Sequence, residues 1–210
     1  MYYPPSFELR KKRKVFLTAE QLIAFENNVK ELYEQGKVKG PVHLSKNNEE
    51  QLIELFEFIS PNDWVFSAWR NHYHALLHGV PAAKLLEWIQ EGRSMGISHK
   101  EPHFYTSSIV GGIIPIALGA ALSFKLKNKD QKVWCFIGDM TFETGGFLEA
   151  YKYAQNFDLP LQFVIEDNNN SVHTSTESAW GKRCVIPSRA IYYTYEMEYP
   201  HHGTGKWVNF

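Results

Sequence analysis

The sequence predicts an α/β fold built on a parallel sheet with helices on both faces, because two short apolar runs flank one amphipathic stretch. The runs are Val133–Ile137 and Leu161–Ile165, and the stretch between them, Glu143–Asn156, has its apolar residues at helical spacing. Two apolar strands joined by a helix are typical of a βαβ unit, in which helices bury both faces of the sheet. Ligands of such sheets bind beyond the carboxyl ends of the strands. The residues that directly follow the two runs are therefore the first candidates for a functional site.

Capping residues and apolar periodicity predict the other elements. Thr18 and Gln21 have the spacing of a capping box, and the helix that follows them is expected to end near Gly36. The chain is expected to form a single domain over residues 1–210, with an N-terminal helical segment over about residues 1–60. The further expected elements are helices at Asn48–Ile59, Ala82–Gln90 and Pro115–Lys127, and extended segments at 63–70 and 191–198.

Composition and charge exclude several classes of protein. Of the 210 residues, 44% are hydrophobic and the formal net charge is −1, which argues against disorder and against binding to nucleic acid or an anionic membrane. The apolar stretch Ile109–Leu122 contains Gly111, Gly112 and Pro115, so we expect a buried helix rather than a membrane span. Two cysteines do not make a disulfide framework, and the N-terminus lacks the apolar core of a signal peptide. We therefore expect a cytoplasmic protein.

Polar residues follow both apolar runs at the places where a ligand would bind. Asp139 comes just after the first run, and Asn168 and Asn170 come just after the second. A carboxylate, an amide oxygen and a backbone carbonyl are the hard oxygen ligands that Mg²⁺ prefers, and these three residues could supply one each. Their separation matches one strand–helix–strand crossover, which would bring adjacent strand ends together. On this pattern alone, the alternative is that Gly138-Asp139 is an ordinary turn and the asparagine run an ordinary loop.

The same residues resemble the signature of thiamine-diphosphate-dependent enzymes, a Gly-Asp-Gly followed further on by an Asn-Asn pair. Gly138-Asp139 matches the first part and Asn168-Asn169 the second. More closely, the chain resembles the alpha subunit of the 2-oxo acid dehydrogenase E1 component, whose pattern the run Gly138–Tyr151 follows. The resemblance extends in order over about residues 15–176. It also includes the stretches Gly40–Leu44, Ser67–His72, Ser108–Gly111, Pro115–Gly119 and Leu159-Pro160.

The resemblance implies a thiamine-diphosphate-binding (PP-type) domain and assigns roles to individual residues. Asp139 and Asn168, with the carbonyl of Asn170, would ligate Mg²⁺. Arg70 would bind the diphosphate of the cofactor, because a planar guanidinium suits this group. The cofactor-binding positions that the resemblance marks are Trp69, Arg70, Ser108, Val110, Gly138, Asp139, Met140, Asn168 and Asn170. Among these, the backbone near positions 108 and 110 would contact the aminopyrimidine ring.

Three histidines are the candidates for catalysis. By the resemblance, His43 and His72 would line the diphosphate end or the substrate channel. The late run Tyr199–Gly203 weakly resembles a Tyr-x-His-Gly-His loop of the family, so one of its two histidines, for which we take His202, would face the substrate as an acid–base group. The alternative for this histidine pair is an ordinary place on the surface.

The chain departs from the family pattern at several positions. Met140 stands where the signature has a glycine, and Trp69 replaces a tyrosine. Ser108 replaces a glycine, and Asp167 replaces an asparagine beside the proposed metal ligand. None of these changes removes a proposed ligand. The family also usually continues much further after the asparagine run than this chain does.

Thiamine catalysis needs a glutamate against the aminopyrimidine, which helps to ionise the thiazolium carbon. In two-chain enzymes of this type that glutamate belongs to the other subunit, and we assign it to no residue of this chain. The resemblance therefore implies an alpha-type subunit of an α2β2 enzyme, active only with a beta-type partner. Such an enzyme decarboxylates a 2-oxo acid and transfers the acyl carbanion to an acceptor such as a lipoyl group. The alternatives are a split transketolase-like or carboligating enzyme with an aldehyde acceptor, and a non-catalytic cofactor-binding subunit.

Overall fold

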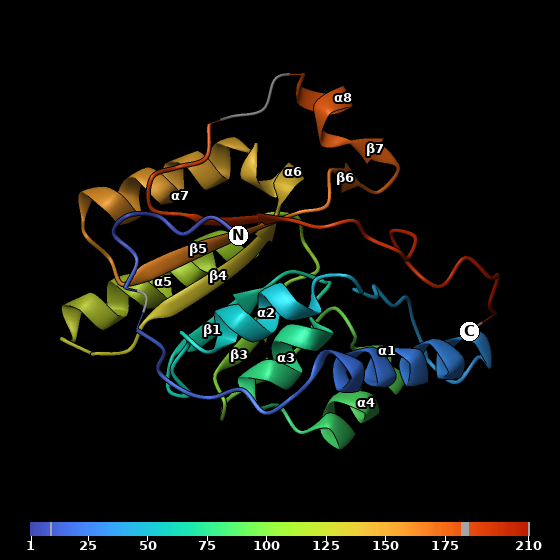
Figure 1. Ribbon diagram of the computed structural model, residues 1–210. Coiled ribbons are helices and arrows are strands. Elements are labelled where there is room, and N and C mark those ends of the chain that lie inside the picture. Colours follow the sequence, from blue (N-terminus) through green and yellow to red (C-terminus); the bar gives the residue numbers. More distant parts are fainter. Residues whose placement is uncertain (9, 182–184, 210) are drawn as a thin grey trace.

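A six-stranded sheet with the strand order β2-β3-β1-β4-β5-β8 forms the centre of the computed structural model, which describes residues 1–8, 10–181 and 185–209 (Figure 1). Neighbouring strands run parallel, except that β2 and β3 pair antiparallel. The predicted βαβ unit is confirmed as β4, α7 and β5. The sheet strands are β1 Trp64–Ser67, β2 Ser98–His99, β3 Phe104–Thr106, β4 Val133–Gly138, β5 Leu161–Asp167 and β8 Ile191–Thr194, and a separate hairpin consists of β6 Asn170–Ser171 and β7 Thr174–Ser175.

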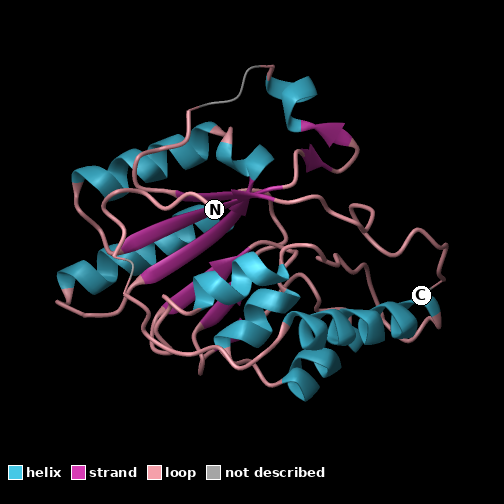
Figure 2. Ribbon diagram, viewed as in Figure 1, coloured by secondary structure: helices cyan, strands magenta, loops and turns pink. Residues whose placement is uncertain are grey.

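Helices cover both faces of the sheet, so the predicted fold class is confirmed (Figures 1 and 2). On one face, Trp134 and Phe136 of β4 pack with α1–α4. On the other face, Val133, Cys135 and Ile137 of the same strand pack with α5 and α7. Because successive side chains of a strand point to opposite faces, a strand buried on both sides needs a continuous apolar run. The helices are α1 Ala19–Glu34, α2 Glu49–Phe56, α3 His72–His78, α4 Ala82–Gln90, α5 Ile113–Leu126, α6 Asp139–Phe142, α7 Gly145–Asn156 and α8 Thr176–Trp180.

Capping residues begin several helices where the sequence predicted them. The Thr18 hydroxyl accepts the N–H of Gln21 at 3.4 Å, and the Gln21 side chain accepts the N–H of Thr18 at 3.0 Å. This capping box pairs two N–H groups that the first turn of α1 would otherwise leave unbonded. Pro115 lies in the first turn of α5, as expected. Thr144 caps α7, which is the helix of the βαβ unit, by accepting the N–H of Phe147.

Some elements differ from the sequence prediction. Helix α3 was not predicted, because all seven of its residues are buried and therefore show no alternation of polar and apolar sides. Gly138-Asp139-Met140 is not a simple turn, since Asp139 begins the one-turn helix α6. The last strand ends at Thr194 instead of continuing toward Glu198.

The N-terminal helical segment begins only at Ala19, and the described residues before it form an arm along the sheet. The backbone of Tyr2 bonds with that of Tyr192 in β8 at 2.8 and 3.2 Å. Cys135 is buried as a free thiol, and the second cysteine, Cys184, lies outside the described residues. Among the helices that the structure describes, none has both the length and the apolar character that crossing a membrane requires.

Candidate functional site

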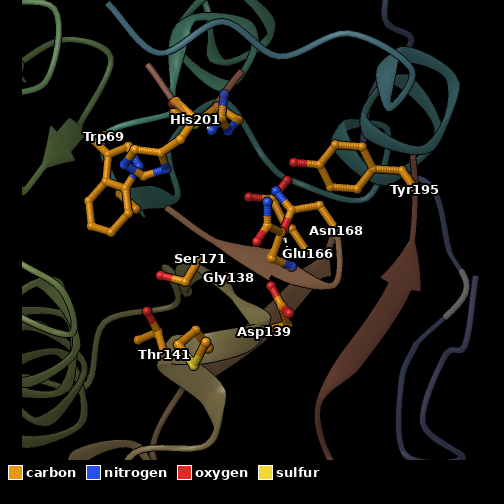
Figure 3. A pocket seen from close by; sticks show the side chains of 13 residues that line it. Trp69, Gly138, Asp139, Thr141, Glu166, Asn168, Ser171, Tyr195 and His201 are labelled. Carbon is orange, nitrogen blue, oxygen red and sulfur yellow. Dashed lines mark hydrogen bonds between the residues drawn. The ribbon is translucent and has the colours of Figure 1, made fainter. Parts of the chain in front are cut away.

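A polar pocket lies at the carboxyl ends of β1, β4 and β5, where ligands bind in sheets of this class (Figure 3). Gly138 at the end of β4 is level with Glu166 of β5 in the parallel register, so the residues that follow the two strands meet at one edge. The loop after β1 adds further side chains, and Tyr195 comes from the end of β8. The pocket is lined by Ala68, Trp69, Arg70, Gly138, Asp139, Met140, Thr141, Glu166, Asn168, Asn170, Ser171, Tyr195 and His201.

Asp139 and Asn168 supply the hard oxygen atoms of this pocket. Asp139 is buried at the start of α6, and the hydroxyl of Thr176 donates a hydrogen bond to its carboxylate. The side-chain oxygen of Asn168 accepts the N–H of Asn170 at 3.1 Å, which fixes the amide and the backbone after it in one tight turn. The pocket therefore holds the kinds of oxygen donor that a Mg²⁺ site requires.

Arg70 gives the pocket a positive charge. Its guanidinium donates hydrogen bonds to the carbonyl oxygens of Leu44 and of His201, the second at 3.2 Å. These bonds tie the loop after β1 to two other loops and hold the guanidinium at the pocket wall. A guanidinium has five N–H donors in a planar fork, so donors remain for an anionic group such as a phosphate.

Glu166 is a second carboxylate of the pocket, and the sequence analysis did not single it out. It accepts hydrogen bonds from His74 Nε2 at 3.1 Å and from the hydroxyl of Tyr193. The Tyr193 hydroxyl itself accepts a bond of 3.3 Å from the side chain of Asn48. Because His74, Tyr193 and Asn48 are all buried, an internal polar network holds this one carboxylate in place. The missed signal is the length of β5, which runs through this residue instead of ending before it.

Three histidines and a tryptophan gather beside the pocket. The ring of His43 lies 5.1 Å from that of His201, 6.4 Å from that of His202 and 6.1 Å from that of Trp69. His43 is buried, and its Nδ1 has no hydrogen-bond partner within the part of the chain that the structure describes. Burial, assisted by the charge of Arg70, lowers the pKa of His43 to about 3, so this ring is neutral at ordinary pH. Burial also lowers the pKa of His201.

The family model of the dehydrogenase E1 component matches residues 18–189. This chain belongs to the dehydrogenase E1 component family. It is 32% identical over 161 residues to pyruvate dehydrogenase E1 component subunit alpha-3, chloroplastic, of Arabidopsis thaliana, which covers 69% of the chain and 38% of the relative. It is 30% identical over 167 residues to pyruvate dehydrogenase E1 component subunit alpha of Zymomonas mobilis, covering 74% and 47%. The mitochondrial alpha subunit of Sminthopsis macroura is 29% identical over 174 residues, covering 79% and 48%.

The region matched by the family model includes the whole βαβ unit and the loops that follow its two strands. Asp139, Asn168 and Arg70 all lie inside it, whereas His201 and His202 lie beyond its end. The family relationship implied by the sequence is thus confirmed. The chain spans about two-fifths to half of the length of the curated relatives described above.

The structure brings together most of the residues of this chain that were predicted from the sequence to bind the cofactor. Ser108 and Val110 are the exceptions, since they lie on the exposed loop between β3 and α5 and not in the pocket lining. The predicted positions that do line the pocket are Trp69, Arg70, Gly138, Asp139, Met140, Asn168 and Asn170.

The three predicted catalytic histidines lie in different surroundings. His72 is fully buried, with one ring nitrogen 3.2 Å from Glu26 and the other 2.9 Å from Ser94, so the structure does not bring it to the pocket. His43 contacts the pocket from one side, as described above. His201 lines the pocket, whereas its neighbour His202 lies in an adjoining groove. No pattern in the sequence distinguishes these two adjacent residues, because the direction of a loop side chain follows no period.

Proposed function

We propose that this chain binds thiamine diphosphate through Mg²⁺ in the pocket and is the alpha-type subunit of a two-chain enzyme. That enzyme decarboxylates a 2-oxo acid and transfers the acyl carbanion to an acceptor. The observation that carries the proposal is the meeting of Asp139 and Asn168 at the ends of neighbouring strands, with Arg70 in the same pocket. The family and the alpha-subunit names of the relatives support it.

The charges of the pocket suit a metal and an anionic cofactor together. Asp139, Asn168 and the backbone carbonyl of Asn170 would hold Mg²⁺ for the diphosphate of the cofactor. Arg70 donates to the diphosphate and offsets its charge. Glu166 adds a second negative charge that a divalent cation would balance. The bound cofactor supplies the carbanion stabilisation that decarboxylation of a 2-oxo acid requires.

Histidines handle protons at the substrate end of the site. His43 remains neutral because its pKa is lowered. Its Nδ1, which has no partner among the described residues, can therefore donate or accept a hydrogen bond, according to the tautomer, without taking up a full proton. His201 lines the pocket directly, and His202 keeps the predicted acid–base role as an adjoining group. His72 supports the site from within the core, through its contacts with Glu26 and Ser94.

The partner is a beta-type subunit that carries the activating glutamate, in an α2β2 assembly. Support comes from α5, because one apolar groove lies between it and α7 and a second runs between it and β3. Ile116 of α5 is 55% exposed, and Tyr153 of α7 is 39% exposed. Exposed apolar surface of this kind marks protein interfaces. The loop with Ser108 and Val110 leads into α5, so the predicted aminopyrimidine contacts would form where the partner docks.

Pyruvate is the proposed substrate, because the relatives are pyruvate dehydrogenase subunits, and a lipoyl group is the proposed acceptor. A split transketolase-like or carboligating enzyme would use the same cofactor site with an aldehyde acceptor. A non-catalytic cofactor-binding subunit is disfavoured, since Asp139, Asn168 and Arg70 are all retained. The cytoplasm is the proposed compartment.

Calorimetry on the full chain, in the oligomeric state in which it purifies, tests the cofactor. Thiamine diphosphate should bind in the presence of Mg²⁺ and lose its affinity in excess EDTA; binding that ignores the metal would overturn the proposal. With the partner subunit present, pyruvate should release CO₂ and reduce an artificial electron acceptor. A carbon–carbon product from an added aldehyde would favour the transketolase-like alternative, and binding without turnover would favour the non-catalytic one.

A further inference from the structure

The segment that follows β5 folds back over the start of α6. It consists of the hairpin β6–β7 and the short helix α8, residues 170–180, and lies beside α6 at one end of the molecule (Figure 1). Two contacts join α8 to α6. The Thr176 hydroxyl donates to the Oδ2 atom of Asp139, and the indole N–H of Trp180 lies 3.1 Å from the sulfur of Met140. The first and last residues of α8 therefore contact Asp139 and Met140, the first two residues of α6.

Thr176 is fully buried, although its helix lies at the molecular surface. A hydroxyl that donates to one oxygen of a carboxylate limits the rotation of that group. The orientation matters, because Mg²⁺ demands nearly ideal octahedral geometry from its ligands. Loss of a group that hydrogen-bonds a metal ligand typically costs about 10- to 100-fold in metal affinity.

Met140 is one of the positions at which this chain departs from the family signature. Glycine, the signature residue, has no side chain and could not contact α8 as Met140 does. A thioether is a weak hydrogen-bond acceptor and packs favourably against aromatic rings. Trp180 remains 52% exposed, so its contact with the sulfur is not ordinary core packing. The methionine at position 140 thus makes a contact with Trp180, which lies on the same helix as Thr176.

We propose that Thr176 is a positioning residue for the metal ligand Asp139, and that the Trp180–Met140 contact holds α8 in the place from which Thr176 acts. The inference rests on the proposed function, whose metal site it deepens. It predicts that metal affinity depends on residues of α8, which itself provides none of the proposed ligands.

The test measures the affinity of Mn²⁺, a paramagnetic substitute for Mg²⁺, by electron paramagnetic resonance on the chain assembled with its partner subunit, with thiamine diphosphate present. Thr176→Val keeps the shape of the side chain and removes the hydroxyl, and should weaken Mn²⁺ binding about 10- to 100-fold. Thr176→Ser keeps the hydroxyl and should restore the affinity to within a few-fold of wild type. Thr18→Val is the matched control: its hydroxyl accepts the N–H of Gln21 at the start of α1, outside the pocket lining, so stability should fall without a change in Mn²⁺ affinity.

Two further variants test the contact between Trp180 and Met140. Met140→Gly and Trp180→Phe should each weaken Mn²⁺ binding, by less than Thr176→Val does. If wild type binds Mn²⁺ and Thr176→Val binds it equally well, the inference is wrong while the proposed function stands. If Thr176→Val does not fold, unchanged Mn²⁺ affinity in both Met140→Gly and Trp180→Phe overturns the inference instead. Absence of Mn²⁺ binding in wild type would contradict the proposed function itself.

Discussion

Two regions of the molecule are left open by the packing of its core, and they are opposite in character. The pocket at the carboxyl edge of the sheet is polar, and its charged side chains are held by other parts of the chain. The outer surface of α5 and α7 is apolar, with Ile116 and Leu148 exposed beside shallow grooves. Polar groups held in one orientation are suited to a small charged ligand. Exposed apolar side chains are suited to another protein.

The difference matters because the proposed function gives each region a different binding partner. Asp139, Arg70 and Glu166 place charges of both signs in one pocket, and a metal with an anionic cofactor would satisfy them. The apolar surface of α5 gains stability only when water is removed from it. If both proposals hold, cofactor binding and assembly should respond to different substitutions.

The largest effect should come from leaving the partner out. The chain alone should show no turnover of any 2-oxo acid, because the glutamate that activates the cofactor is assigned to the beta-type subunit. Release of CO₂ from pyruvate, measured with and without the partner, checks this. Robust decarboxylation by the purified single chain would refute the proposal that the partner subunit supplies the activating glutamate.

Replacing Asp139 with alanine should weaken Mg²⁺ and thiamine diphosphate together, by at least about 100-fold, since loss of a direct ligand costs more than loss of a supporting group. Calorimetry of the assembled enzyme measures both affinities. Asp130→Ala, at an exposed position outside the pocket, is the matched control and should leave them unchanged. An Asp139→Ala enzyme with wild-type cofactor affinity would rule out this residue as the metal ligand.

The sequence predicted the pocket better than its surroundings for a physical reason. A buried parallel strand requires a continuous apolar run, so Val133–Ile137 and Leu161–Ile165 marked the two strand ends at which Asp139 and Asn168 lie. Position after a strand is a local property, and the sequence displays it directly. Contacts between distant segments have no such local signal.

Residues beyond the two strand ends show that limit. Thr176 reaches Asp139 through a hairpin and a five-residue helix, and no period in the sequence marks that return. His72 was predicted to line the diphosphate end or the substrate channel, but it lies on α3, whose complete burial was not visible as a pattern. Residues 191–198 were predicted to be extended throughout, whereas β8 stops at Thr194 and Tyr195 lines the pocket.

The apolar region should control assembly and not cofactor affinity. We expect the chain expressed alone to oligomerise or aggregate, and to become a defined complex with its partner, because an obligate interface buries more than about 2,000 Å². Ile116→Asp should disrupt that complex and change Mg²⁺-dependent cofactor affinity only a few-fold. Phe16→Asp, at a position 80% exposed on the N-terminal arm, is the matched control and should leave assembly intact. Light scattering distinguishes these states; a stable, monodisperse wild-type monomer at micromolar concentration would count heavily against the proposed assembly.

The smallest effect concerns how the free energy of unfolding depends on pH. It compares a histidine beside the pocket with one in the core. Burial lowers the pKa of His43, beside the pocket, to about 3, and that of His78, in the core, to about 4. Above an unfolded-state pKa of about 6.5, both histidines are neutral in both states and do not affect stability. Below it, the unfolded chain binds protons that the folded chain excludes, so the free energy of unfolding should fall as pH drops from 6.5 toward 4.

Each fully buried histidine could lower that free energy by up to about 1.4 kcal/mol per pH unit. His43→Gln and His78→Gln should each flatten this dependence by removing one titrating group. Urea unfolding at pH 7.5, 6 and 5 measures the slope for wild type and both variants. If the slope of His43→Gln equals that of wild type, His43 is not the neutral, desolvated ring that its proposed hydrogen-bonding role beside the pocket requires.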